Sequence, residues 1–255
     1  MRIYHLRNVT MVIETERKVL LVDPMLGDKG TLPPFAFIRS KPRKNPTVSL
    51  PEGSKALLDS VTHAIITHRH PDHLDGAGIA FLKEKEIPVL CSVHDKEILH
   101  KQGLAIHKTF DYWEQKEFSG GYITGIPATH GYGFVTKFMG DVMGFLLELP
   151  GEPSIYLSSD TIFTNGVNQV LTEYGPDVSV VACGSAQFDI FRPLLMNMDE
   201  IIQFVRQSPG KVIANHLEAI NHCPTTRKQL RNMLEEEKLQ DKVFIPNDGE
   251  SIELL

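Results

Sequence analysis

The chain has little cysteine, no long hydrophobic run and no excess of positive charge. Its three cysteines, Cys91, Cys183 and Cys223, include no C-x-x-C pair, so the sequence carries no disulfide framework. No segment approaches the roughly 20 apolar residues that a membrane-spanning helix needs. Charged residues interrupt the first eighteen positions and leave no apolar stretch for a signal peptide. We therefore expect a soluble, cytoplasmic protein.

Acidic and basic residues nearly balance, with 32 Asp and Glu, 26 Lys and Arg, and a formal net charge of −6. A mildly acidic chain argues against a protein whose main partner is the phosphate backbone of a nucleic acid. With 255 residues, of which 42% are hydrophobic and 23% charged, the chain can bury a full core. No repeat and no Gly/Ser-rich linker divides it, so we expect a single domain over residues 1–255.

Short apolar runs predict strands in the first part of the chain and alternating helices and strands after it. Strands are expected at 2–6, 10–14, 18–22, 64–67, 89–91, 105–107, 122–126, 143–149, 154–157, 178–182 and 211–214. Helices are expected at 76–86, 94–102, 167–174, 198–207 and 227–238. Strands at 243–245 and 251–254 are expected to form a hairpin around Asn247-Asp248-Gly249.

Residues 24–53 form a long segment rich in proline. Loops of this length inside a domain are usually functional lids or disordered segments, and Phe35 and Phe37 favour an ordered flap. The flap also carries four cations, which are either a solvated face or an anion-binding rim for a phosphorylated or carboxylate substrate: Arg39, Lys41, Arg43 and Lys44.

Histidine is concentrated in one place. Of the eleven histidines, His68, His70 and His73 fall within six residues, together with Asp72. This cluster directly follows an expected apolar strand, so its side chains start from a rigid edge. In an extended stretch His68 and His70 point to one side and can share one ion, while Asp72 and His73 can serve a second. Imidazole and carboxylate suit zinc and, less selectively, manganese or iron; the alternative is a polar surface turn.

Three further candidates, His130, Asp160 and His216, also stand where an apolar strand ends. Taken singly, the two histidines are more often structural, and the aspartate could cap the segment at Thr161. Together with the first cluster they predict a two-metal hydrolytic site at one rim of a sandwich. His222 is either a substrate or second-shell group or part of a loop packed under the site, and we expect Cys223 to be structural.

The H-x-H-x-D-H segment, the lone His130, the Asp of Ser-Asp-Thr and the final His216, in this order, resemble the metallo-β-lactamase superfamily. Within it the chain is similar to compact single-domain metal-dependent hydrolases related to the ascorbate-phosphate lactonase. The resemblance implies an α/β four-layer fold, an αββα sandwich of two mixed β-sheets flanked by helices. It also implies a dinuclear site in which His68, His70 and His130 bind the first metal, Asp72, His73 and His216 bind the second, and Asp160 bridges both.

Two positions depart from the family pattern: Asn8 stands where many relatives have His, and Ser159 stands where the family has Gly. Asn8 is a candidate for a substrate or second-shell role, and Asp23 and Thr161 are expected to orient the ligands. Two divalent ions, zinc first and manganese or iron as alternatives, would activate water to hydrolyse a small ester, lactone, amide or phosphoester. Asp72 and Asp160 are the expected catalytic carboxylates.

Three other functions would leave different marks on the sequence. A di-iron redox enzyme on the same fold would place Glu where His70 stands and append a flavin domain. A nuclease would insert a second domain and carry basic surfaces. A metal-stabilised, non-catalytic binding module would usually have lost ligands, and all seven are present. We therefore expect a small-molecule substrate, which would be anionic if the flap cations face the site. We expect no nucleic-acid or membrane partner. An oligomer is possible, because aromatic side chains exposed on the flap could be buried between subunits.

Overall fold

Two seven-stranded sheets form the centre of the protein in the computed structural model, which describes residues 1–190 and 192–254. The first sheet, in the order β14-β1-β2-β3-β4-β5-β6, consists of β1 (Arg2–Arg7), β2 (Thr10–Glu14), β3 (Val19–Val22), β4 (His63–Ile66), β5 (Val89–Ser92), β6 (Ile106–Phe110) and β14 (Ser251–Glu253). The second, in the order β13-β12-β11-β10-β9-β8-β7, consists of β7 (Gln115–Phe118), β8 (Gly121–Ala128), β9 (Val142–Glu148), β10 (Ile155–Leu157), β11 (Val178–Ala182), β12 (Lys211–Asn215) and β13 (Val243–Phe244).

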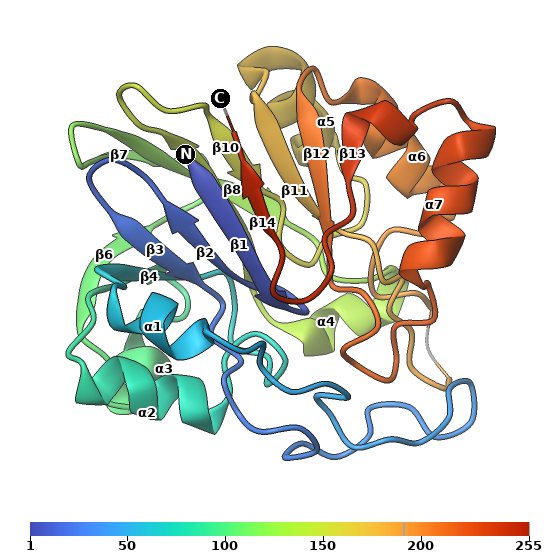
Figure 1. Cartoon of the computed structure of the whole chain (residues 1–255), viewed down its shortest axis with the longest axis horizontal. Coiled ribbons are helices and arrows are strands. Elements are labelled where there is room, and N and C mark those ends of the chain that lie inside the picture. Colours follow the sequence, from blue (N-terminus) through green and yellow to red (C-terminus); the bar gives the residue numbers. More distant parts are fainter. Residues whose placement is uncertain (191, 255) are drawn as a thin grey trace.

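Helices lie on the outer sides of this pair of sheets (Figure 1). Leu58, Leu82 and Leu99 pack three of them against the first sheet: α1 (Ser54–Asp59), α2 (Gly76–Glu84) and α3 (Lys96–Lys101). Three others pack against the second sheet: α5 (Asn165–Gln169), α6 (Met198–Gln207) and α7 (Arg227–Glu236). Shorter turns complete the set: η1 (Gly133–Val135), α4 (Thr136–Met139), the π-helical η2 (Val170–Tyr174) and η3 (Gln240–Lys242). The predicted αββα sandwich is confirmed.

The main core lies between the sheets. There Met11 and Ile65 from the first sheet pack in one cluster with Phe145 and Ile213 from the second. Because helices cover the outer faces as well, most strands are buried on both sides and are nearly continuous apolar runs. In β9 six of seven residues are buried. This pattern explains why periodicity located the strands well and their ends less well.

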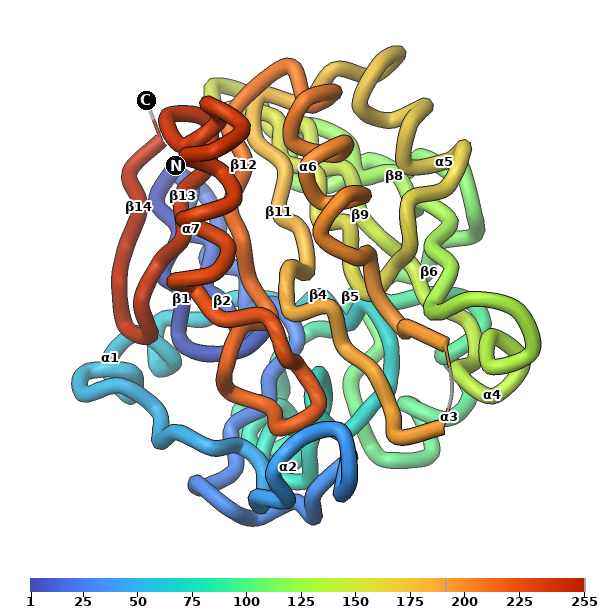
Figure 2. The backbone as a smooth tube through the Cα atoms, turned by 90° about the vertical axis from the view of Figure 1, so that its right-hand side faces the viewer, coloured from blue at the N-terminus to red at the C-terminus, as the bar shows by residue number. Residues whose placement is uncertain are grey.

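Strand direction brings several loops to the same end of the sandwich. In the first sheet β3 to β6 run parallel. In the second sheet β10 to β13 run parallel, and β8 shares their direction because both β8 and β10 are antiparallel to β9. The segments that follow β3, β4, β8, β10 and β12 therefore leave the sheets at one end. Figures 1 and 2 show the flap, residues 24–53, running beneath this end.

The expected C-terminal hairpin is wrong. β13 pairs in parallel with β12 of the second sheet, while β14 pairs antiparallel with β1 of the first sheet. Asn247-Asp248-Gly249 therefore lies in a connection between sheets. Arg227 holds this connection, since its guanidinium donates to the Pro246 carbonyl (2.8 Å) and to Asp248 Oδ1 (2.6 Å). The Asn-Asp-Gly turn sequence is a local indication of a hairpin. The strands with which β13 and β14 pair, β12 and β1, are longer and lie elsewhere in the sequence, so no local pattern indicates them.

Other differences are smaller. The short helices α1 and α4, of six and four residues, were not expected from the sequence. The helix expected at 167–174 starts earlier, at Asn165, where the Thr164 side chain accepts a hydrogen bond from Val167 N, and it ends in the π-helical turn η2. The expected capping box at the start of α7 is present.

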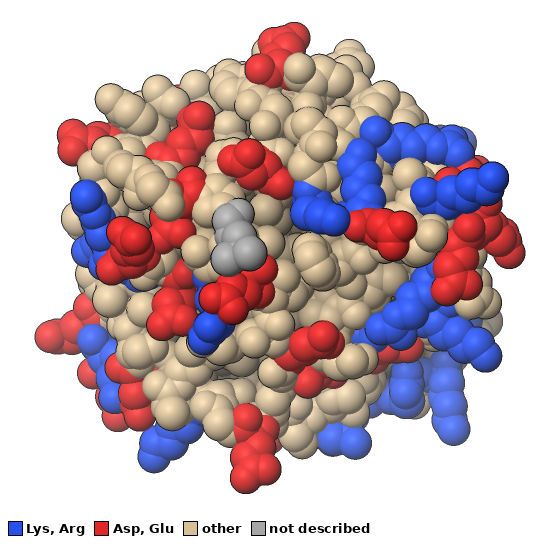
Figure 3. Space-filling model, turned by 45° about the horizontal axis from the view of Figure 1, so that its top comes forward, with Lys and Arg blue, Asp and Glu red and all other residues tan. Residues whose placement is uncertain are grey.

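The flap is irregular but held in place, as expected. A single bridge between Leu32 and Asn45 closes it on itself, and Ala36 and Asn45 are fully buried. None of the helices in the described part of the chain is long and apolar enough to cross a membrane. Figure 3 shows Lys and Arg gathered on the side where Figure 1 places α6 and α7, with Asp and Glu among them, so that this face carries both signs of charge.

Candidate metal centre

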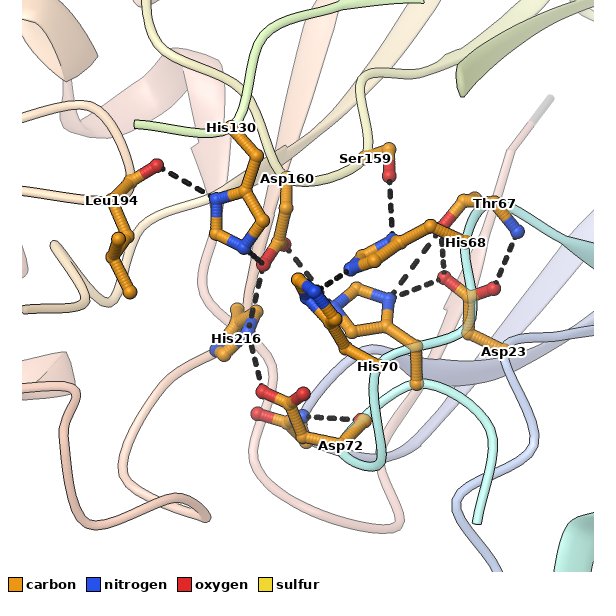
Figure 4. A network of polar contacts seen from close by, with 12 residues as sticks. Asp23, Thr67, His68, His70, Asp72, His130, Ser159, Asp160, Leu194 and His216 are labelled. Carbon is orange, nitrogen blue, oxygen red and sulfur yellow. Dashed lines mark hydrogen bonds and ion pairs between the residues drawn. The ribbon is translucent and has the colours of Figure 1, made fainter. Parts of the chain in front are cut away.

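The loops at the flap end bring the seven predicted ligands together (Figure 4). Within each of three groups, one ligand atom from every residue lies within 4.8 Å of the others. The groups are His68 with His70 and His130, His68 with His73 and Asp160, and Asp72 with His73 and His216. All seven are buried except His70, which is half-buried. Residues as far apart in the chain as His68 and His216 thus form one connected cluster.

Asp160 lies at the middle of the cluster. One of its oxygens, Oδ1, is 3.3 Å from His73 Nε2, and the other, Oδ2, is 3.4 Å from His130 Nε2 and 3.5 Å from His216 Nε2. The carboxylate reaches this position because the chain turns sharply after β10, where Ser159 adopts a left-handed conformation with φ 59°. Glycine takes this conformation more easily, which accounts for the family's glycine at the position of Ser159. Asp160 therefore faces both halves of the cluster.

Several buried atoms of the cluster have no hydrogen-bond partner among the described residues. They are His73 Nε2, His216 Nε2 and Asp160 Oδ1. Buried polar atoms are normally paired, so unpaired nitrogen and carboxylate atoms that face one another call for a group to fill the space between them. Imidazole nitrogen and carboxylate oxygen are ligands of zinc, and manganese and iron accept the same set. The residues present fit divalent cations.

Asp23, which the sequence analysis expects to orient a ligand, makes a hydrogen bond to His73. His73 Nδ1 donates to Asp23 Oδ2 over 2.8 Å, which turns Nε2 toward Asp160. Asp23 is itself fixed, because its carboxylate accepts hydrogen bonds from the backbone N (2.8 Å) and hydroxyl (2.7 Å) of Thr67. A carboxylate behind a ligand histidine fixes the tautomer and the direction of the ring.

Other ligands are oriented by partners that the sequence analysis did not identify. His130 Nδ1 donates to the Leu194 carbonyl (2.9 Å), and His216 Nδ1 lies 3.3 Å from Cys223 Sγ. Both contacts leave Nε2 directed into the cluster. No sequence signal marks Leu194, whereas Cys223 stands in the Asn215–Pro224 stretch and could have been considered as a partner of His216.

Asn8 makes hydrogen bonds to the backbone of two residues of the cluster, Asp72 and His216. Its Nδ2 donates to the Asp72 carbonyl (2.9 Å), and its carbonyl accepts from His216 N (2.8 Å). Thr161 acts through the backbone next to His130, because its hydroxyl accepts from Thr129 N over 3.1 Å. Both residues therefore position ligand-bearing segments.

Burial and mutual charge shift the pKa values of the cluster. Burial lowers the pKa of His70 to about 4 and that of His68 well below its usual value. Burial also disfavours the charged forms of His73 and Asp160, but the Asp160 and Asp23 carboxylates raise the pKa of His73 to about 10. His73 and His216 likewise hold the pKa of Asp160 well below its usual range. Asp160 therefore stays ionised, and His68 and His70 stay neutral, which are the forms of these side chains that bind cations.

A small apolar cavity opens beside the cluster. Its volume is about 110 Å³, and besides His70, Asp72 and His130 it is lined by Phe35, Pro71, Met139, Phe188, Leu194 and His222. The flap cations do not line it: all four are exposed, and Arg39 Nε donates to the Asp189 carbonyl. Of the two interpretations of the flap charges, the structure favours a solvated face. From the loop after His130, Met139 forms part of the wall, while Phe134 and Phe138 are exposed.

A family model described as "Beta-lactamase superfamily domain" matches residues 18–216, a range that includes all seven clustered residues. The chain belongs to this family. The predicted membership of the metallo-β-lactamase superfamily of metal-dependent hydrolases is thereby confirmed. The UPF0173 protein YddR of Bacillus subtilis (strain 168) is 30% identical to the chain and is matched over 98% of this chain and 99% of its own length.

Two solved structures are similar over the whole chain. One is a possible metal-dependent hydrolase from Veillonella parvula DSM 2008, with a TM-score of 0.90, 30% identity, and coverage of 100% of this chain and 99% of the other. The second is an isothiocyanate hydrolase from Delia radicum gut bacteria, with a TM-score of 0.89, 29% identity and the same coverage. Both likenesses extend through the flap and the loops around the cluster.

Proposed function

We propose that the protein hydrolyses a small, uncharged molecule with an apolar substituent, using a pair of divalent cations held by the seven clustered ligands. The observation that carries this proposal is the position of Asp160. Its two oxygens lie within 3.5 Å of Nε2 atoms from three different histidines. A carboxylate shared in this way suits the bridging position of a two-metal hydrolytic site.

The cations, Asp72 and the cavity wall would have different roles in such a reaction. When bound, a pair of divalent cations supplies Lewis acidity and brings the pKa of water toward ~7. Asp72 lines the cavity, and although burial opposes its charged form, His216 holds the pKa of Asp72 below its usual range. Its carboxylate therefore stays ionised and can accept a hydrogen bond from the attacking water, which orients that water. The apolar part of the cavity wall reduces the contact of a bound molecule with water, which strengthens polar interactions there.

The cavity also narrows the class of substrate. A space of about 110 Å³ with no Lys or Arg among the described residues that line it suits an uncharged molecule better than a phosphoester. The similarity to an isothiocyanate hydrolase supports one such class. In an isothiocyanate, water adds to the central carbon of R–N=C=S, and the adduct breaks down to the amine and carbonyl sulfide. Short esters, lactones and amides also react by addition of water to a carbon atom bonded to a heteroatom, so the same site could bind and hydrolyse them.

The test begins with elemental analysis of protein purified without chelators or added metal. We expect about two divalent ions per chain and clearly lower contents in Asp160→Asn and His216→Ala. The control is His100→Ala, because His100 is an exposed histidine of α3. Full occupancy in both site variants would refute the ligand assignment.

Activity is then measured with allyl and benzyl isothiocyanate and with panels of esters, lactones, amides and phosphoesters, with zinc, manganese or iron restored in turn. We expect turnover of at least one uncharged class and none of the phosphoesters. A protein that binds two metals but hydrolyses nothing would support the non-catalytic binding module instead.

A further inference from the structure

His222 is a buried histidine that the metal cluster does not use. It lines the cavity together with His70, Asp72 and His130. Its ring lies edge-on to Phe35, with centroids 5.3 Å apart, and stacks on Phe188 at 5.5 Å and 17°. The two aromatic contacts fix the plane of the imidazole on both sides.

One ring nitrogen of His222 lacks a hydrogen-bond partner. His222 is 5% exposed, and its Nδ1 has no hydrogen-bond partner within residues 1–190 and 192–254. A buried polar atom without a partner costs stability and calls for an explanation. The ring contacts both Phe35 and Phe188 and lines the cavity, so a ligand in the cavity would lie beside this imidazole.

Backbone hydrogen bonds hold the surroundings of the ring in place. Phe35 N donates to Asn221 Oδ1 over 2.8 Å, and Asn221 Nδ2 donates to the Ala36 carbonyl over 2.7 Å. On the other side Gln187 N donates to the His222 carbonyl over 3.0 Å. The flap and the segment before Asp189 are thus both fastened to the loop that carries His222, so the imidazole is preorganised rather than mobile.

We propose that His222 is a catalytic residue, whose imidazole donates a hydrogen bond to the substrate heteroatom that gains negative charge as water adds to the neighbouring carbon. The apolar substituent of the substrate then lies against Phe35 and Phe188. This inference rests on the proposed hydrolytic function and adds the group that recognises the polar end of the substrate. A fixed donor in a site without bulk water stabilises developing charge more than it would in water.

Two variants separate the hydrogen bond from the shape of the ring. His222→Phe keeps a ring between the two aromatic neighbours but has no N–H, and His222→Gln keeps a donor. With metals restored, we expect His222→Phe to retain the wild-type metal content and to lose about 100-fold or more in kcat/KM. His222→Gln should recover part of that loss. His100→Phe, at an exposed site, is the matched control and should behave as wild type.

A second measurement does not depend on turnover. Acetophenone has an apolar ring and a carbonyl oxygen but no leaving group, so its binding to the metal-loaded protein can be measured by calorimetry. We expect about tenfold weaker binding to His222→Phe than to wild type, as for one lost hydrogen bond. Equal binding or equal kcat/KM in His222→Phe and wild type would overturn the inference, and so would loss of metal from this variant.

The two proposals can fail separately. If the wild type hydrolyses nothing, the proposed function fails and the catalytic role of His222 fails with it. Weaker acetophenone binding by His222→Phe would in that case still support a ligand contact at His222. If the wild type is active and both His222 variants match it, only the role of His222 is wrong.

Discussion

Asn45 and Asn221 hold each other through two hydrogen bonds although they lie 176 residues apart in the chain. Asn221 N donates to Asn45 Oδ1 over 2.8 Å, and Asn45 Nδ2 donates to Asn221 Oδ1 over 3.2 Å. Both side chains are buried. This pair fastens the flap to the loop between His216 and His222, so the cavity wall formed by Phe35 depends on it.

Replacing Asn221 by Ala should loosen the flap without emptying the metal centre. The change removes the Asn221 partner of Phe35 N and of the Ala36 carbonyl, while Asn45 Nδ2 keeps its bond to the Pro33 carbonyl. The loss should lower the free energy of unfolding by about 2–3 kcal/mol in urea denaturation. We expect the metal content to stay at the wild-type level and KM to rise, because the defect lies in the cavity wall. Asn165→Ala, at an exposed position, is the control. An unchanged KM would show that the flap does not shape the substrate site.

A second contact fastens the tip of the flap. The Asp189 carboxylate accepts hydrogen bonds from the backbone N of Phe37, Ile38 and Arg39, each over 2.9 Å. Because a carboxylate satisfies these amides much better than a methyl group, Asp189→Ala should free the tip, where Arg39, Arg43 and Lys44 are sites for trypsin. We expect cleavage there to become several-fold faster in limited proteolysis, with global stability changed by less than about 1 kcal/mol. Asp141→Ala, at an exposed position, should digest like wild type.

The ligand cluster was predictable because its signal is local. His68, His130, Asp160 and His216 each follow an apolar strand, and strands that share a direction end at the same edge of a sheet. The order of these residues along the chain resembles that of the metallo-β-lactamase superfamily, and this resemblance implied which residues would share each metal. The sandwich itself followed from the same run of strands and helices, with boundaries displaced by a few residues.

Contacts between distant side chains were not predictable in the same way. Asn8 meets Asp72 across 64 residues, and Asn45 meets Asn221 across 176, at positions set by the sheets and by irregular loops. Neither pair has a sequence spacing that marks it. The failed C-terminal hairpin has the same origin, because the choice between a local turn and pairing with β1 or β12 depends on partners far away in the chain.

Cys223 offers a test of how the metal ligands are oriented. Its Sγ lies 3.3 Å from His216 Nδ1, where other sites of this kind use a carboxylate or a carbonyl. Cys223→Ala removes the partner, so we expect affinity for a metal at the proposed Asp72, His73 and His216 group to fall about 10- to 100-fold in competition with a chelator. Cys223→Ser should restore part of the affinity because its hydroxyl can accept from Nδ1. Cys91→Ala, a buried cysteine in β5, controls for the loss of a thiol, and equal affinity in Cys223→Ala and Cys91→Ala would contradict this role.

His63 makes stability depend on pH at a place away from the metal centre. Its ring packs edge-on against Phe118, with centroids 5.2 Å apart, and burial, with Lys18 nearby, lowers the pKa of His63 to about 4. In the unfolded chain the pKa of a histidine is near ~6.5. Between these values the unfolded state binds a proton that the folded state does not, so the free energy of unfolding should fall as the pH drops from 6.5 to about 4.

Replacing His63 by Phe should remove this contribution. We expect the loss of stability over the same pH window to shrink by on the order of 2 kcal/mol, measured by urea denaturation at several pH values with the metal content held constant. His100→Phe changes a histidine that is exposed in α3, and it should leave the pH dependence as in wild type. If the stability of His63→Phe fell with pH as steeply as that of wild type, His63 would not be the source of the acid sensitivity.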